Sequence, residues 1–337
     1  MRKIKLGIIG CGIAAKELHW PALKKLKKMF EIKACCSHTE KSASQYSKMV
    51  GDIPYFTDYR ELFKLDNIEA VAITVPINLN YEITKASLEA GKHVIVEKPL
   101  AQNLEVAEEM VELSKKYETV SMLAENFRYV KAYREVKEVI EKGTIGKPYS
   151  VIFNDFNYIS PNMTFALKEW RVHHKHIGGL VYDSGIHRIA AMRLIFGDLV
   201  PTAAFVSSAF PELGILDMLS MQFVLDNDRT FKGIYTIAFS KTGHREYRMI
   251  VLGSKGNLLF EARNNSRDYI IKIKSEGKTV KTIICDDKGL GIIEGIIGEF
   301  TDFHNSICTK KQVKSTFNEG YKDIWVLANA IQIAGKS

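Results

Sequence analysis

A lysine and a carboxylate–imidazole pair stand where side chains could transfer protons. The lysine occurs in 93-HVIVEKPLAQN-103, directly after a short apolar run that reads as a buried strand. Pro99 cannot donate to a sheet and disfavours helical geometry at the residue before it, so the chain must turn here. Lys98 is therefore held at the end of the predicted strand. It is either a solvated surface charge or a cation placed beside a reacting group.

Asp183 and His187 are four residues apart, so on a helix they share one face. A carboxylate and an imidazole arranged in this way can both reach one hydroxyl group. Histidine titrates near neutral pH, which suits reversible proton transfer. The alternative is an aspartate near a helix N-terminus with an unrelated histidine one turn later.

A third pattern, near the N-terminus, indicates a phosphate-binding turn. The first predicted strand runs into 10-GCGIAA-15, where Gly10 permits a tight turn and Gly12 lets a pyrophosphate approach the backbone. The small Ala15 allows a helix to pack closely on the strand, and the start of that helix offers N–H groups to phosphates. The pattern, in this place, predicts dinucleotide binding.

The end of the second predicted strand indicates which dinucleotide is bound. An acidic residue there would bind the ribose hydroxyls and favour NAD. The chain instead has Ser37, His38, Thr39 and Lys41, whose hydroxyls, imidazole and cation suit a 2′-phosphate. We therefore predict NADP in preference to NAD, with NAD as the alternative. The other interpretation is that these residues only begin the next helix, with Ser37 or Thr39 as its cap.

The elements that must position these groups alternate between strand and helix in the first third of the chain. Short apolar runs predict buried strands, and the stretches between them have helical spacing of apolar residues. Each crossover between parallel strands needs a helix on a sheet face, so the pattern predicts a doubly wound parallel sheet of Rossmann type. The predicted strands are 4–9, 31–36, 69–75, 93–96 and 120–123, and two of the helices are 79–91 and 103–117.

The pattern changes after about Asn126. Helices predicted at 132–143 and 179–196 are followed, from residue 202 to about 285, by successive strands without long helices between them. This order predicts an α+β domain with a large, mostly antiparallel open sheet. We therefore divide the chain into an NAD(P)-binding domain, residues 1–124, and a substrate-binding and oligomerisation domain, residues 125–337.

The composition limits the partners. The net charge of +8 is spread over scattered lysines, and the densest cluster, 24-KKLKKMF-30, alternates like an exposed helix face, so we expect no nucleic-acid partner. No segment reaches the ~20 uninterrupted apolar residues of a membrane span. The five cysteines show no CxxC spacing. This favours reduced thiols in a cytoplasmic protein over disulfides or a structural zinc site.

These motifs together resemble the Gfo/Idh/MocA oxidoreductase family, the group of glucose–fructose oxidoreductase and inositol dehydrogenase. The EKP tripeptide and the DxxxH pair, at this separation, are specific in combination. The resemblance implies an NAD(P)-dependent dehydrogenase or reductase that acts on a CH–OH group of a sugar, cyclitol or related polyol. It covers nearly the whole chain, and the matching segments are 10-GCGIAA-15, 74-TVPINLNYE-82, 91-GKHVIVEKPLA-101, 143-GTIG-146, 170-WR-171, 178-GGLVYDSGIH-187 and 318-NEGYKDIWVLANAI-331.

The resemblance also implies roles for single residues. Lys98 is expected to project toward the nicotinamide and a substrate hydroxyl, and the bond before Pro99 is expected to be cis. His187 is expected to be the general acid/base, while Asp183 fixes the substrate and the orientation of the imidazole. The predicted cofactor-binding residues are Gly10, Gly12, Ile13, Ala14, Ser37, His38, Thr39, Lys41, Thr74, Pro76, Asn78, Glu97, Lys98 and Asn126, and the predicted substrate-binding residues are Trp170, Arg171, Tyr182, Asp183 and His187.

Two positions depart from the family pattern. Many relatives carry an acid where Ala190 stands and a histidine where Asn80 stands, which leaves the substrate less certain than the reaction. The cluster 173-HHKH-176 could offer imidazoles to zinc. Adjacent histidines such as His173 and His174 point differently on most backbones, however. We predict no metal, and a loop around His176 that faces substrate or solvent.

Three other functions stay open at this point. One is a non-catalytic, dinucleotide-sensing regulator, and another is an NAD-dependent glycosidase of the same family. The third is an oxidoreductase that couples two sugars without releasing its cofactor. The resemblance further implies that another subunit covers part of the second domain's sheet. We therefore expect a homodimer or homotetramer.

Overall fold

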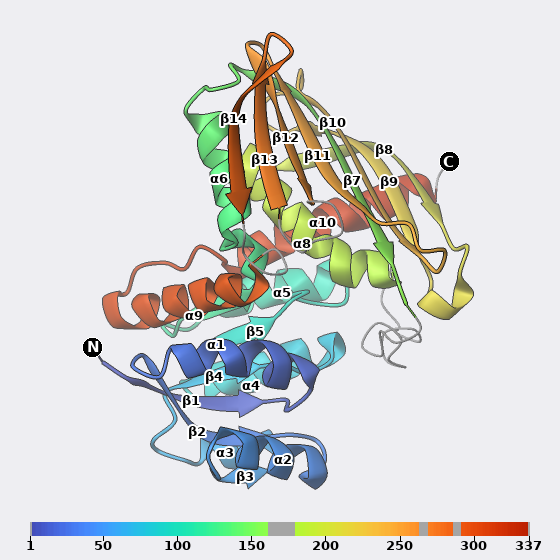
Figure 1. Ribbon diagram of the computed structural model, residues 1–337. Helices are drawn as coiled ribbons and strands as arrows, with labels where there is room; N and C mark the ends of the chain where they lie inside the picture. The colour runs from blue at the N-terminus through green and yellow to red at the C-terminus, as the bar shows by residue number, and fades with distance from the viewer. Residues whose placement is uncertain (1, 161–178, 263–268, 286–290, 336–337) are drawn as a thin grey trace. The chain divides into compact units, whose positions relative to one another are not determined.

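The structure is a computed structural model that describes residues 2–160, 179–262, 269–285 and 291–335 (Figure 1). Its residues form two units. The first comprises the residues up to Tyr129 together with Ile293–Tyr321, and the second comprises Val130–Ile292 and the residues from Lys322 onward. The sequence-based division into residues 1–124 and 125–337 did not predict that Ile293–Tyr321 belongs to the first unit.

Six parallel strands form the sheet of the first unit, in the order β3-β2-β1-β4-β5-β6. The strand order reverses at β1, and ligands of such sheets bind beyond the carboxyl ends of the strands at this switch point. The predicted doubly wound parallel sheet is confirmed. The strands are β1 (Ile4–Ile9), β2 (Phe30–Cys36), β3 (Tyr55–Phe56), β4 (Ala70–Ile73), β5 (His93–Glu97) and β6 (Ser121–Ala124).

Helices around this sheet bury its apolar strands. All four residues of β4 are buried, as are Val94, Ile95 and Val96 of β5, which is the pattern of strands covered on both faces. The elements between the strands are α1 (Trp20–Lys25), α2 (Glu40–Val50), α3 (Tyr59–Phe63), α4 (Asn80–Glu89) and α5 (Leu104–Lys115), with short turns η2 (Ile77–Leu79) and η3 (Asn126–Arg128).

A π-helical segment, η1 (Ala14–His19), leads into α1. Its wider turn is seen at Trp20, whose N–H donates to the carbonyl of Ala15, five residues earlier. Pro21 explains the widening, because proline has no N–H and its ring clashes with the carbonyl four residues before it in a regular α-helix. Ala15 is fully buried, as its expected close packing requires.

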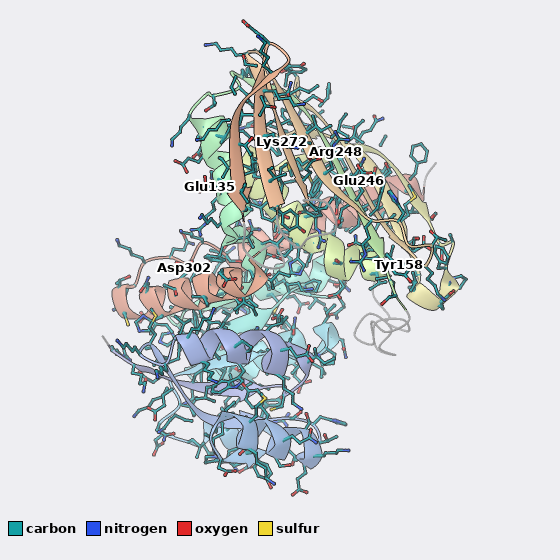
Figure 2. All side chains as sticks on the ribbon, viewed as in Figure 1. Glu135, Tyr158, Glu246, Arg248, Lys272 and Asp302 are labelled. Atoms are coloured by element: carbon teal, nitrogen blue, oxygen red, sulfur yellow. The ribbon has the colours of Figure 1, made fainter. Side chains whose placement is uncertain are left out.

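The helix α9 (Ile292–Thr309) belongs, from Ile293 onward, to the first unit. Phe300 packs edge-to-face on His19 and Phe30, with ring centroids 5.2 and 5.6 Å apart. Asp302, labelled in Figure 2, accepts hydrogen bonds from the Tyr129 hydroxyl at 2.7 Å and from the Lys314 N–H at 2.8 Å. These contacts attach residues 293–321 to the Rossmann sheet.

The second unit contains an eight-stranded sheet in the order β14-β13-β12-β11-β7-β10-β9-β8. Every neighbouring pair is antiparallel except β7 and β10, which are parallel. The predicted large, mostly antiparallel sheet is confirmed. Its strands are β7 (Pro148–Tyr158), β8 (Leu199–Ser207), β9 (Met218–Leu225), β10 (Lys232–Ser240), β11 (Glu246–Gly253), β12 (Gly256–Ala262), β13 (Tyr269–Ser275) and β14 (Lys278–Cys285), with a short turn η4 (Pro211–Leu213).

One face of this sheet is covered by α6 (Lys131–Glu141) and α8 (Gly179–Phe196) (Figure 1). The helix α8 lies between the sheet and α10 (Phe317–Ala334), because a Cβ added at Gly185 would lie 3.7 Å from Ile237 of β10 and 3.8 Å from Leu327 of α10. Most residues of α8 are accordingly buried.

Among the described residues, no helix has the length and apolar character that crossing a membrane requires.

Candidate dinucleotide and active site

The glycine turn after β1 is preformed. Gly10 has φ +98°, and its N–H donates to the Cys36 carbonyl at 2.8 Å. A Cβ at Gly10 would lie 2.3 Å from the Thr74 carbonyl oxygen, so only glycine fits. Thr74 supports the turn from the end of β4, because its N–H donates to Ile9 O at 2.7 Å and its hydroxyl donates to Gly10 O.

Gly12 is exposed, and among the described residues an added Cβ would meet no atom within 4 Å. The fold itself therefore does not require glycine here. A phosphate group that approaches the backbone would require it. The carbonyl of Gly12 accepts from the Lys16 N–H at 3.1 Å, so the N–H groups of Ile13 and Ala14 lie in the first helical turn, the part of a helix that offers unpaired donors to an anion.

A pocket of about 190 Å³ lies beyond β1 and β2. Its wall includes Ser37 and His38, two residues predicted to meet the adenosine ribose. Sequence reasoning missed other residues of this wall. Two of them, Thr57 and Tyr59, follow the two-residue strand β3, which is too short to show a period. The missed lining residues are Ile9, Cys36, Thr57, Tyr59, Val75, Leu79, Glu82 and Ile83.

Tyr59 and Glu82 form one side of this pocket. The Tyr59 hydroxyl donates to Glu82 Oε1 at 2.8 Å. Burial first, and then this hydrogen bond, raise the pKa of Tyr59 to about 12. The Arg60 guanidinium lies 4.7 Å from the Tyr59 ring centroid and 3.6 Å from Glu82 Oε1, so a cation stands close to the pocket.

Thr39 caps the helix after the pocket. Its Oγ1 accepts from the Ser42 N–H at 3.3 Å at the start of α2. The interpretation of this segment as the beginning of a helix therefore holds for Thr39, whose hydroxyl acceptor serves the backbone. Lys41 is exposed on the first turn of the same helix.

Two polar side chains, those of Asn80 and Glu97, hydrogen-bond to the backbone of the turn after β5. The Lys98–Pro99 bond is cis, as expected. Asn80, at the start of α4, is buried and donates to the carbonyls of Glu97 and Pro99, both at 3.0 Å. Glu97 accepts from the Lys98 N–H at 3.2 Å and lies 2.7 Å from Nε2 of the buried His19. Glu97 thus fixes the backbone of Lys98.

Glu299 of α9 is a buried carboxyl group close to Glu97 and Glu125. Burial raises the pKa of Glu299 well above its ordinary value, and the charges of Glu97 and Glu125 raise it further. A protonated Glu299 follows from these causes, since three ionised carboxylates in one buried region would repel one another.

The second unit carries the DxxxH pair on α8. Asp183 is 7 % exposed and His187 is half-buried. Tyr182 is 2 % exposed, which is the burial of a core side chain, and its burial raises its pKa. Of the three predicted catalytic residues, Lys98 belongs to the first unit, and Asp183 and His187 belong to the second.

The remaining predicted residues are placed as follows. Pro76 and Asn78 are exposed just after β4, and Asn126 is buried in η3. Trp170, Arg171 and the histidines His173, His174 and His176 lie outside the described residues, so their predicted contacts stay predictions. Within the described residues, no group of three or more His, Cys, Asp or Glu side chains could hold a metal ion.

Comparison with known proteins shows which class this fold and site define. Residues 4–125 match the oxidoreductase family model for the NAD-binding Rossmann fold, and residues 137–336 match the model for its C-terminal alpha/beta domain. The chain belongs to the Gfo/Idh/MocA family of NAD(P)-binding oxidoreductases, as the resemblance implied.

Individual relatives are similar over most of their length. The crystal structure of an oxidoreductase from Thermotoga maritima has a TM-score of 0.89 and 35% identity, and the match covers 99% of this chain and 97% of that one. Myo-inositol 2-dehydrogenase of Thermotoga maritima is 26% identical over 81% of this chain and 79% of its own length. The 1,5-anhydro-D-fructose reductase of Ensifer adhaerens is 27% identical over 75% of this chain and 74% of its own length.

Proposed function

We propose that this oxidoreductase transfers a hydride between a nicotinamide and a carbon that bears a hydroxyl or carbonyl group in a sugar, cyclitol or related polyol. The observation that carries this proposal is the buried carboxylate of Asp183 one helical turn before the half-buried imidazole of His187 on α8. Relatives that are named for an inositol and an anhydrofructose support the substrate class.

In this mechanism the bound cofactor supplies the hydride acceptor or donor. His187 removes the hydroxyl proton during oxidation and returns it during reduction. Asp183 holds the substrate and the orientation of the imidazole. The Lys98 ammonium, on a backbone fixed by Glu97 and Asn80, stabilises the negative charge that develops on the reacting oxygen.

NADP is the proposed cofactor, with NAD as the alternative. The residue directly after β2 is Ser37 and not an acid, and Ser37 and His38 line the pocket there. Lys41 and Arg60 add cations near the same end of the sheet. Glu82 opposes a phosphate in this pocket, although its carboxylate is engaged by Tyr59.

The proposed assembly is a homodimer or homotetramer formed through the outer face of the eight-stranded sheet. Strand pairing sets Ile250, Ile152 and Ile234 side by side on three adjacent strands. Ile152 and Ile234 are each 39% exposed, and a second subunit would remove this apolar row from water. Lys272 and Arg248, labelled in Figure 2, flank the row on β13 and β11.

We place the protein in the cytoplasm, because all five cysteines are free thiols.

The test is a panel of sugars, cyclitols and polyols, with the matching ketones, each assayed with NADP(H) and NAD(H) by the absorbance of the reduced nicotinamide. Net, substrate-dependent change in that absorbance is expected for members of one stereochemical series. His187→Gln is the control and should abolish it. Cofactor that binds without any turnover would instead support a regulator, and bond cleavage without net cofactor consumption would support a glycosidase.

A further inference from the structure

A buried ion pair lies beside His187. Asp155 of β7 is 1% exposed, and its Oδ2 lies 2.6 Å from Nε of Arg188 on α8. Arg188 Nη2 donates to Asp155 Oδ1 at 3.4 Å, and the side chain of Asn157 donates to the same oxygen at 3.0 Å. At its other end the guanidinium donates to the carbonyl and hydroxyl of Ser184, both at 3.3 Å. The pair thus links the sheet to the helical turn that carries His187.

Tyrosines from three strands and one helix surround the pair. They are Tyr133 of α6, Tyr235 of β10, Tyr247 of β11 and Tyr269 of β13. The Tyr133 and Tyr247 hydroxyls are hydrogen-bonded to each other, and Arg188 Cζ lies 5.7 Å from the Tyr247 ring centroid. Burial raises the pKa values of Tyr133 and Tyr235, so these neighbours are neutral and Asp155 is the anion that faces Arg188.

Stability alone does not account for such a pair. Desolvation of two charges costs about as much as their attraction returns, and apolar side chains of similar volume are often equally stable. Hydrophobic packing alone also leaves the rotation of α8 about its own axis loosely defined. The helix is largely buried and packs on the sheet and on α10, and such non-directional contacts resist rotation about its axis only weakly. A directional pair between Arg188 and β7 fixes that rotation.

We propose that Asp155 and Arg188 are positioning residues for His187: their pair holds the rotation of α8, and with it the direction in which the imidazole is presented. This inference rests on the proposed function, in which His187 exchanges the proton. Sequence adjacency of His187 and Arg188 makes the coupling direct, since any rotation that breaks the pair turns both side chains together. Burial raises the pKa of Asp155, and the Arg188 guanidinium, the Asn157 side chain and finally the charge of His187 oppose that rise, so Asp155 and His187 share an electrostatic environment.

The main test is the double variant Asp155→Asn/Arg188→Met, which removes both charges at similar volume. It is expected to fold with a melting temperature close to that of the unaltered protein. Its turnover number on the substrate found in the panel is expected to fall by ~10²-fold, the loss that a displacement of about 1 Å can cause. The Michaelis constant for the cofactor should change by no more than about twofold, because the dinucleotide turn belongs to the other unit.

A second buried pair on the same helix provides the matched control. Arg193 of α8 and Asp323 of α10 are 2.5 Å apart, Nη1 to Oδ1, and their side chains are 3% and 0% exposed. Arg193→Met/Asp323→Asn removes an equally buried pair that joins α8 to α10, and it also takes Arg193 from Asp198, 2.6 Å away. This control should leave the turnover number within about threefold of the unaltered protein, even where the loss of the Arg193 contact with Asp198 lowers the melting temperature. Equal losses of turnover in both double variants would show a general effect of α8 stability and would overturn the proposal.

An NMR titration tests the positioning without any substrate. The His187 resonance can be assigned among the nine histidines by its absence from His187→Gln. Asp155→Asn removes a neighbouring negative charge, so the His187 titration midpoint is expected to fall by about one unit. If this variant does not fold, the double variant serves instead, with a changed His187 chemical shift as the expected result. An unchanged His187 resonance in a folded variant would refute the positioning role. If the unaltered protein turned over no substrate, the proposed function would fail, while this titration would still decide the inference.

Discussion

Replacing Gly10 and Gly12 by alanine, one at a time, separates what the fold requires from what a bound dinucleotide requires. At Gly10 an alanine must hold φ +98°, and its Cβ would lie 2.3 Å from the Thr74 carbonyl oxygen and 2.7 Å from the Thr74 carbonyl carbon. The left-handed backbone costs about 1–2 kcal/mol and the overlap with a backbone group about 1–3 kcal/mol more. Gly10→Ala should therefore lose about 2–5 kcal/mol of a total stability of ~5–15 kcal/mol.

At Gly12 the same change meets open space, so the fold should tolerate it. The backbone there does not need a left-handed conformation, and alanine restricts the unfolded chain, so Gly12→Ala should be neutral or up to about 1 kcal/mol more stable. The added methyl group would stand where the pyrophosphate approaches. The dissociation constant for NADP(H) should therefore rise by at least about tenfold, which is ~1.4 kcal/mol.

Thermal unfolding of the apo proteins and calorimetric titration with NADP(H) measure the two effects independently. The expected pattern is a large loss of melting temperature with Gly10→Ala, and weaker cofactor binding at unchanged melting temperature with Gly12→Ala. Unaltered affinity in Gly12→Ala would place the pyrophosphate elsewhere. An unaltered melting temperature in Gly10→Ala would refute the tight turn against Thr74.

Five other substitutions test separate parts of the reasoning. Ser37→Asp should reverse the preference from NADP(H) to NAD(H) in calorimetric titration, because a carboxylate repels a 2′-phosphate; tighter NAD(H) binding by the unaltered protein would contradict the premise. Lys98→Ala and His187→Ala should each lower the turnover number by ~10²–10⁴ with cofactor affinity retained, and near-full activity of either would remove that residue from the mechanism. Ile152→Lys should lower the molar mass measured by light scattering to that of a monomer. A monomeric unaltered protein would refute the proposed assembly. The folded state raises the pKa of Glu299 above its unfolded value of 4.5, so the stability that its proton contributes is complete below that value and is lost as the pH rises toward the folded pKa. Urea unfolding across this range should find Glu299→Gln gaining on the unaltered protein by about 1.4 kcal/mol per pH unit, whereas a constant difference would mean that the carboxyl is not buried as described.

Local patterns made the first sheet predictable. Its central strands are short runs of apolar residues, and the turn at Gly10 is prescribed by residue types within six positions of sequence. Two features lay beyond such patterns. The strand β3 has only two residues, and its pairing is set by β2, so no period announces the pocket residues that follow it. The π-helical turn depends on the conflict between Pro21 and its own helix, which changes geometry without changing the helical pattern.

Long-range packing accounts for what the sequence did not reveal. An amphipathic pattern predicts that α9 buries one face, but it does not say which sheet receives that face, and the choice of the first unit appears only in contacts such as Phe300 with His19 and Phe30. For Asp155, by contrast, the sequence did contain a pattern from which its burial could have been predicted. It shares the strand phase of Val151 and Phe153, both fully buried, so an inward-facing carboxylate that needs a cation could have been read from the alternation.

The two departures from the family pattern now have different physical meanings. Asn80, in place of a histidine, is buried and donates to two carbonyls of the turn that carries Lys98, so this change concerns the support of the lysine. Ala190, in place of an acid, is fully buried on α8, where an unpartnered carboxylate would be costly. The anion near His187 comes instead from Asp155 on β7, and it arrives already paired with Arg188. Ala190→Asp would bury a carboxylate at a fully buried position of α8, so the variant should lose stability by several kcal/mol and gain no activity. A stable and more active Ala190→Asp protein would mean that the pair on β7 does not replace the missing acid.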